Sequence, residues 1–141
     1  VLIGLWLTKE KNTMIKFKES KIKTINKKFT NDCVIRSISI VLDETYKSVF
    51  HDLMKLGSAL GGYPNCDFVW QPYIESKGMI RHKMPRPENK PRGTIKLKNW
   101  SFTGKAVVVN SGHLTAVVNG YCLDTWDCTY RPVNSYWTYD K

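Results

Sequence analysis

The fold is decided by the stretch HLTAVVNGYCLDTW, residues 113–126. Two runs of strand-forming residues flank the pair Asn119-Gly120, and Asn-Gly between such runs is a strong signal of a two-residue β-hairpin turn. A turn of that length pairs Val118 with Tyr121 and fixes the register of the pairs further out. We therefore predict that residues 113–118 and 121–126 form neighbouring antiparallel strands.

The register assigns side chains to the two faces of this hairpin. Because side chains alternate along a strand, His113 and Asp124 share a face, where they are diagonal neighbours. Trp126 lies directly opposite His113 and is expected to shield the contact between His113 and Asp124 from water. Asp127 falls on the other face and is the poorer partner for the histidine. The side chains predicted on the shared face are His113, Thr115, Val117, Cys122, Asp124 and Trp126.

A second informative segment lies about eighty residues earlier in the chain. Thr30-Asn31-Asp32 is typical of a helix N-cap, because each side chain can accept hydrogen bonds from the free N–H groups of a first helical turn. Cys33 follows at once, and apolar residues at three- and four-residue spacing predict a mostly buried helix over residues 33–42. The thiol of Cys33 is therefore expected at the N-terminus of a helix.

Together these residues point to nucleophilic chemistry. A thiol at a helix start, a histidine on a strand and a carboxylate on the next strand are the parts of a cysteine hydrolase. The helix start and an imidazolium stabilise a thiolate, and the carboxylate orients the histidine. We take Cys33, His113 and Asp124 as the candidate catalytic residues. Each of the three alone has a plainer explanation, as a small core residue, a structural histidine or a turn residue.

The rest of the chain predicts helices first and a sheet second, which is the order of an α+β domain. The proline-rich segment at residues 84–93 is expected to be a surface loop. Further helices are predicted from Asp43 or Thr45 to Leu60 and over residues 68–77, and further strands over residues 14–18, 106–110 and 133–139.

Size and composition limit the class of protein. The 141 residues, 42% of them hydrophobic and 12% aromatic, are enough for one globular domain with a real core. No stretch approaches the ~20 apolar residues of a membrane-spanning helix, so no membrane partner is expected. The chain begins at Val1, and Met14 is an alternative start. Residues 1–13 are then either upstream of the native start or an ordinary N-terminal strand.

The charge and the cysteines bear on partners and location. Most of the 22 basic residues lie in two blocks, residues 9–28 and 81–105, and the net charge is +10. Such blocks bind nucleic acid or an acidic partner, or are simply solvated surface. Four cysteines without a CxxC pair or a secretion signal indicate reduced thiols in the cytoplasm. No metal and no cofactor are expected.

The candidate site resembles that of the papain-like cysteine peptidases. Residues 113–120 look like the histidine strand of that superfamily, and Asp124-Thr125-Trp126 is similar to its Asn-Ser-Trp element. The segment Asn31-Asp32-Cys33-Val34-Ile35-Arg36 is closer to the nucleophile segment of the ovarian-tumour-type deubiquitinases. The pattern also looks like small papain-fold proteins encoded by bacteriophages, which implies a host cytoplasm. The resemblance implies a peptidase domain over residues 29–141 after a basic segment at 1–28, with the cysteine on a central helix packed on a C-terminal antiparallel sheet.

The resemblance leaves the oxyanion donor open. Papain-like enzymes often carry a Gln five or six residues before the cysteine, and here Lys28 and Lys27 stand there. The ovarian-tumour type implies backbone amides before Cys33 instead, with Asn31 or Asn26 contributing a side-chain amide. The expected activity is hydrolysis of a peptide or isopeptide bond in a polypeptide substrate. The alternatives are an inactive papain-fold binding protein and a basic nucleic-acid-associated phage protein.

Overall fold

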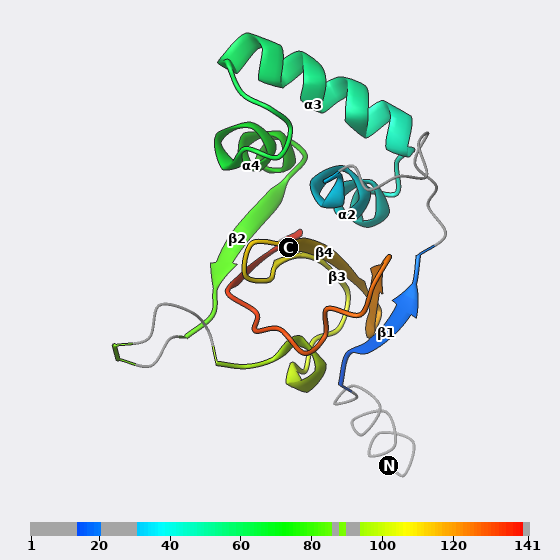
Figure 1. Ribbon diagram of the computed structural model, residues 1–141, viewed down its shortest axis with the longest axis vertical. Helices are drawn as coiled ribbons and strands as arrows, with labels where there is room; N and C mark the ends of the chain where they lie inside the picture. Colours follow the sequence, from blue (N-terminus) through cyan, green and yellow to red (C-terminus); the bar gives the residue numbers. More distant parts are fainter. Residues whose placement is uncertain (1–13, 21–30, 86–87, 90–93, 140–141) are drawn as a thin grey trace.

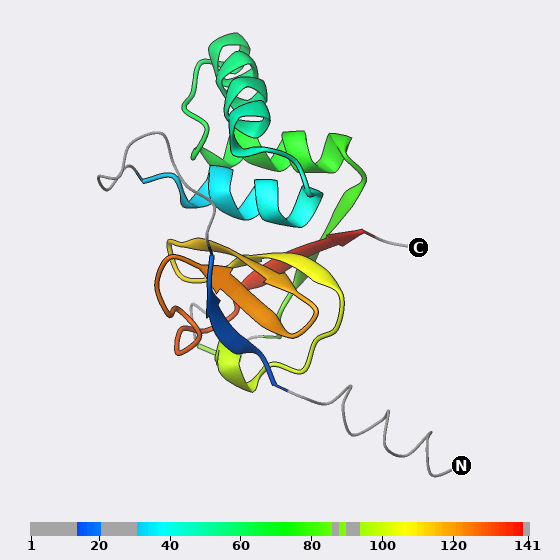
Figure 2. The same ribbon diagram turned by 90° about the vertical axis from the view of Figure 1, so that its right-hand side faces the viewer.

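Three helices and six strands form the described part of the chain, which is residues 14–20, 31–85, 88–89 and 94–139 of the computed structural model. The helices lie together on one side of a strongly curved sheet (Figures 1 and 2). The α+β class, with helices before most of the sheet, is confirmed. The elements are β1 (Lys16–Glu19), α2 (Cys33–Leu42), α3 (Tyr46–Leu60), α4 (Asp67–Ser76), β2 (Met79–Lys83), the 3₁₀ turn η1 (Leu97–Asn99), β3 (Lys105–Val109), β4 (Leu114–Val118), β5 (Tyr121–Asp124) and β6 (Ser135–Tyr139).

The sheet is mixed rather than antiparallel, which corrects the prediction. Its strand order is β1-β5-β4-β3-β6-β2, and β1 runs parallel to β5 while the other neighbours are antiparallel. A tight turn forces two strands to be antiparallel, but β1 and β5 are separated by the whole helical layer, so no turn fixes their direction. Strand β1 belongs to the basic segment at residues 1–28, and this part of the segment joins the sheet.

The central hairpin has the predicted register. Val118 pairs with Tyr121, and the next pair inward along the strands is Val117 with Cys122. Asn119 has a φ of 50° and Gly120 a φ of 89°. Both values lie in the left-handed region that a type I′ turn requires, and Asn and Gly tolerate it best.

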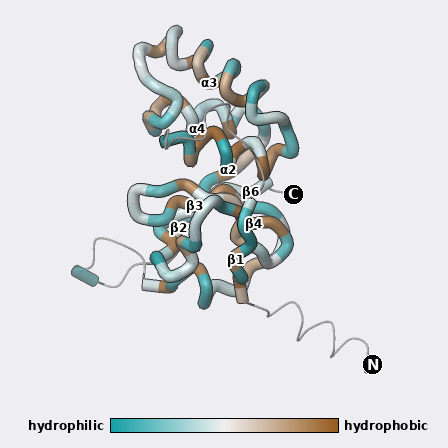
Figure 3. The backbone as a smooth tube through the Cα atoms, turned by 45° about the vertical axis from the view of Figure 1, so that its right-hand side comes forward, coloured by the Kyte–Doolittle hydropathy of each residue, from teal (hydrophilic) through white to brown (hydrophobic). Residues whose placement is uncertain are grey.

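Apolar side chains fill both faces of the sheet. Along β3, Val107 packs with the helices, whereas Ala106 and Val108 belong to a second cluster on the opposite face. In the helical layer Ile38 of α2 and Leu53 of α3 are fully buried. In Figure 3 the tube of α3 alternates between apolar and polar segments, as expected of a helix with one covered face. Helix α2 contacts β3, β4 and β5, so the core positions Cys33 against the hairpin.

The prediction omitted strand β2 and shifted several boundaries. β2 pairs with β6 at the edge of the sheet, and of its five residues only Met79 is buried. A strand with one buried side chain has almost no apolar alternation, so periodicity cannot detect it. Helix α3 begins as predicted after Thr45, whose side chain accepts a hydrogen bond from the backbone N–H of Ser48 at 3.1 Å.

Candidate functional site

The thiol of Cys33 lies at the first residue of α2, as predicted, but the helix is not capped in the predicted way. Asp32 occupies the N-cap position, and its side chain makes no hydrogen bond to the helix N–H groups. The carboxylate instead forms a salt bridge with Arg36 and accepts a hydrogen bond from the Tyr46 hydroxyl at 2.9 Å. Thr30, another candidate cap, lies outside the described residues. Asp32 therefore links the N-terminal ends of α2 and α3.

A tight turn between β3 and β4 positions His113. The backbone N–H of Asn110 donates to the carbonyl of His113 at 2.8 Å. Ser111 and Gly112, with φ of 52° and 78°, make the reversal. The histidine therefore stands directly before β4 rather than within it.

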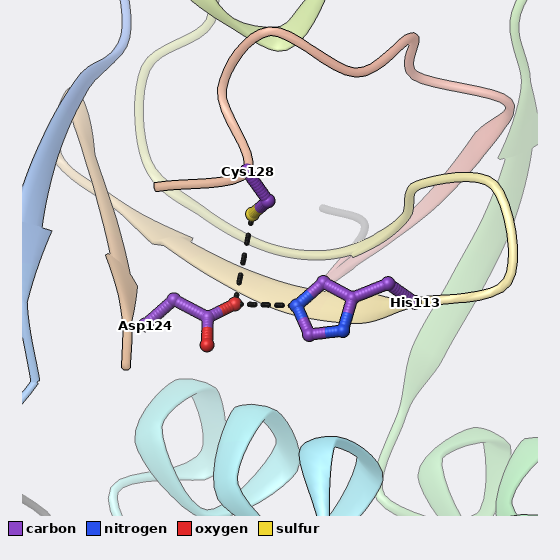
Figure 4. Close-up of side chains that lie close together, drawn as sticks. All are labelled: His113, Asp124 and Cys128. Carbon is purple, nitrogen blue, oxygen red and sulfur yellow. Dashed lines mark hydrogen bonds and ion pairs between the residues drawn. The ribbon is translucent and has the colours of Figure 1, made fainter. Parts of the chain in front are cut away.

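His113 and Asp124 are hydrogen bonded to each other, as the hairpin register predicted. Nε2 of His113 lies 2.7 Å from Oδ2 of Asp124, the last residue of β5 (Figure 4). A carboxylate can only accept, so Nε2 carries the proton and Nδ1 remains for another partner. The ring of Trp126 lies against that of His113, with 4.7 Å between centroids. Asp127 is exposed and accepts from the backbone N–H of Thr129 at 3.0 Å, away from the histidine.

Cys33 and His113 line the same cavity, and the electrostatics of the pair favour charge separation. Burial raises the pKa of the Cys33 thiol, but hydrogen bonds from His113 and the Leu114 N–H, with the charges of His113 and Arg36, hold it below its usual value. Burial lowers the pKa of His113, but its hydrogen bond to Asp124 raises it well above its usual range. The same hydrogen bond holds the pKa of Asp124 below its usual value, against the effect of burial. Thiolate, imidazolium and carboxylate are thus favoured together.

Arg36 and Cys128 also contact Asp124, and neither residue was predicted to belong to the site. Arg36, one helical turn after Cys33, places a guanidinium nitrogen 3.4 Å from Oδ1 of Asp124. Sγ of Cys128 lies 3.6 Å from Oδ2. A hydrogen bond with Cys122 and burial raise the pKa of Cys128, which keeps it a protonated thiol able to donate to the carboxylate. Two signals in the sequence pointed to Arg36: its three-residue spacing from Cys33 on a helix, and its place in the segment that resembles the nucleophile segment of the ovarian-tumour-type deubiquitinases.

The side chains of His113, Asp124 and Cys128 also form the one group in the described residues whose donor atoms could hold a metal ion. These atoms all lie within 4.8 Å of one another (Figure 4). In a tetrahedral zinc site, however, nitrogen and oxygen ligands at about 2.0–2.1 Å from the metal stand about 3.3 Å apart. The 2.7 Å between Nε2 and Oδ2 is a hydrogen-bond distance. A metal would have to break this bond, so the arrangement fits the hydrogen-bonded pair better than a metal centre.

A cavity of about 380 Å³ opens beside Cys33 and His113. Asn31, the predicted oxyanion donor, lies in its wall and is exposed, with a left-handed φ of 54°. Asn26, the alternative donor, lies outside the described residues. The start of α2, the start of α4 and the turn between β3 and β4 supply the walls. The lining residues are Asn31, Cys33, Val34, Asn65, Asp67, Trp70, Val109, Gly112, His113 and Leu114.

Comparison of the chain with protein-family models, with curated proteins and with solved structures finds no match. None of the helices in the described ranges is both long and apolar enough to cross a membrane. Of the first basic block only Lys16 and Lys18 fall within the described residues, and both are exposed on β1. All four cysteines are free thiols.

Proposed function

We propose that this protein is a thiol hydrolase that cleaves a peptide or isopeptide bond, using Cys33 as nucleophile, His113 as acid and base, and Asp124 as the group that orients the histidine. The observation that carries the proposal is one imidazole placed between a helix-start thiol and a buried carboxylate. The arrangement is similar in its parts and their chain order to the sites of papain-like peptidases. The open cavity beside Cys33 gives a polypeptide access to the thiol.

The proposed reaction follows from the charges of the Cys33 thiolate and the His113 imidazolium. The Cys33 thiolate attacks the carbonyl carbon, forming a C–S bond while an electron pair moves onto the oxygen. When this oxyanion collapses, the C–N bond breaks and Nδ1 of His113 protonates the leaving nitrogen. His113 then takes a proton from water, whose oxygen attacks the thioester, and the acid product leaves with the thiolate restored. Backbone N–H groups at the start of α2 and the amide of Asn31 are the available donors for the oxyanion.

Selective thiol labelling tests the proposal without a known substrate. At pH 6, iodoacetamide should alkylate Cys33 at least about tenfold faster than Cys66, because the His113 imidazolium beside Cys33 lowers the pKa of its thiol. His113→Ala should remove most of this advantage. The matched control is His82→Ala, since His82 hydrogen bonds to Thr138 and stacks on Tyr136 on the far strands β2 and β6. Equal rates at Cys33 and Cys66 in the folded protein would contradict the proposal and favour a binding protein without activity.

A further inference from the structure

One charged side chain in the cavity has no part in the proposed chemistry. Besides His113, Asp67 is the one ionisable carboxyl or basic group among the residues that line the cavity. It is the first residue of α4 and is exposed. A helix N-terminus commonly carries an acidic side chain, which accounts for an Asp at this position but not for its place at the cavity.

The carboxylate of Asp67 is held in place by the core. Its Oδ1 accepts from the indole N–H of Trp70 at 3.1 Å. Trp70 is 3% exposed and packs edge-on against Trp137, with ring centroids 5.9 Å apart. One oxygen is thus fixed by a buried ring, and the other has no hydrogen-bond partner among the residues that the structure describes.

Asp67 forms no salt bridge with a Lys or Arg of the described residues. The chain carries 22 basic residues against 12 acidic ones. An acidic side chain that lines a cavity and has no Lys or Arg partner within the described ranges therefore stands against the overall composition. The negative charge of Asp67 is therefore presented to whatever occupies the cavity beside Cys33.

We infer that Asp67 selects substrates with a basic side chain next to the scissile bond, a conclusion that rests on the proposed function. A compact cavity of 380 Å³ is about 9 Å across. The four-carbon stem of a lysine carries its ammonium on the order of 6 Å from Cα, so such a side chain fits in the cavity that Cys33 and Asp67 both line. Asn31 and Asn65 in the same walls are neutral amides, and the charge of His113 is paired with Asp124 and the Cys33 thiolate. The charge of Asp67 is therefore the feature that distinguishes substrates. The substrate class is a peptide with Lys or Arg beside the cleaved bond.

Charged thiol reagents of similar size test this inference on Cys33 itself. A methanethiosulfonate transfers its thioalkyl group to the thiolate and releases methanesulfinate, and it is available with a trimethylammonium or a sulfonate end. A Cys66→Ser background removes the thiol next to Asp67 and places a good N-cap residue at the start of α4. The measured quantity is the ratio of the two labelling rates at Cys33, cationic over anionic. The charge of Asp67 acts on the two reagents in opposite directions. At a separation on the order of the width of the cavity, Asp67→Asn should therefore lower the ratio about fivefold.

Glu75→Gln supplies the matched control, because Glu75 is exposed on the same helix and outside the cavity. This variant should leave the ratio unchanged. With fluorogenic peptides, Asp67→Asn should lower the ratio of kcat/KM for a lysine substrate to kcat/KM for a leucine substrate about tenfold or more. Rapid labelling of Cys33 with the same ratio in the parent and Asp67→Asn would overturn the role of Asp67 while the proposed function stands. Slow labelling of Cys33 by both reagents, at the rate of an ordinary thiol, would overturn both.

Discussion

Replacement of Asp124 and of Asp127 by Asn gives the sharpest test of the candidate site. Asp124 is the last residue of the hairpin strand β5, and Asp127 lies three residues later. Both substitutions remove one negative charge while keeping the shape of the side chain. Asp124 is 4% exposed and hydrogen bonded to His113, whereas Asp127 is exposed and hydrogen bonded only to Thr129 among the contacts of the described residues. The pair therefore separates loss of the orienting carboxylate from loss of a nearby charge.

The expected size of the effect follows from the contacts of Asp124. An Asn at this position would place either an amide NH₂ or a neutral oxygen against Nε2 of His113 and would remove the charge that holds the imidazolium. Loss of the orienting group of a triad lowers kcat by about 10²–10⁴. Asp127→Asn keeps the oxygen that accepts from the Thr129 N–H, so its activity should stay within about twofold of the parent.

The assay is kcat/KM on a cleaved peptide together with the rate of iodoacetamide labelling of Cys33 as a function of pH. In the parent, Cys33 reactivity should appear at lower pH than that of an ordinary thiol, because its pKa is lowered. In Asp124→Asn the labelling rate of Cys33 should increase only at higher pH than in the parent, since His113 without the carboxylate of Asp124 is protonated less readily. Thermal unfolding of both variants shows whether a loss comes from unfolding. Equal losses in the two variants, or an unchanged pH profile in folded Asp124→Asn, would refute the assignment of Asp124.

Two further predictions concern the helical layer. Arg36→Leu should move the Cys33 labelling profile to higher pH, and it should lower the free energy of unfolding, measured with urea, by about 3–5 kcal/mol. Both effects are expected because Asp32 and Asp124 lose the cation that they share. An unchanged labelling profile would show that Arg36 has only a structural role. Ile38→Ala should lower the free energy of unfolding by about 2–5 kcal/mol, because Ile38 is fully buried in the core cluster under Cys33; the exposed Met54→Ala on α3 is its control and should change it by less than about 1 kcal/mol.

The hairpin was predictable because the residues that determine it are neighbours in the sequence. Asn119-Gly120 fixes the turn, the turn fixes the register, and the register brings His113 to Asp124. The start of α2 at Cys33 was predictable for a similar reason, from a polar cluster followed by apolar periodicity.

What could not be predicted depends on contacts between distant segments. The direction of β1 is set by its packing beside β5, about one hundred residues later in the chain. Asp32 was predicted to cap the helix because an Asp directly before an apolar helix often does so. In the folded chain its carboxylate instead forms a salt bridge with Arg36 and accepts a hydrogen bond from Tyr46. The contact of Arg36 with Asp124 exists only once α2 lies across the end of the hairpin. Neither periodicity nor capping rules carry such information.

The charges around His113 explain why this imidazole would act as a cation. Asp32, Arg36 and Asp124 are joined by two salt bridges and together carry one net negative charge. They are largely removed from water, where an unbalanced charge is costly. A protonated His113, in contact with Asp124, balances that charge. A proton taken from Cys33 therefore moves to a site that the surrounding residues already favour, and the thiolate left behind faces the new imidazolium. On this argument the reactivity proposed for Cys33 comes from the buried network behind the histidine as much as from the start of the helix.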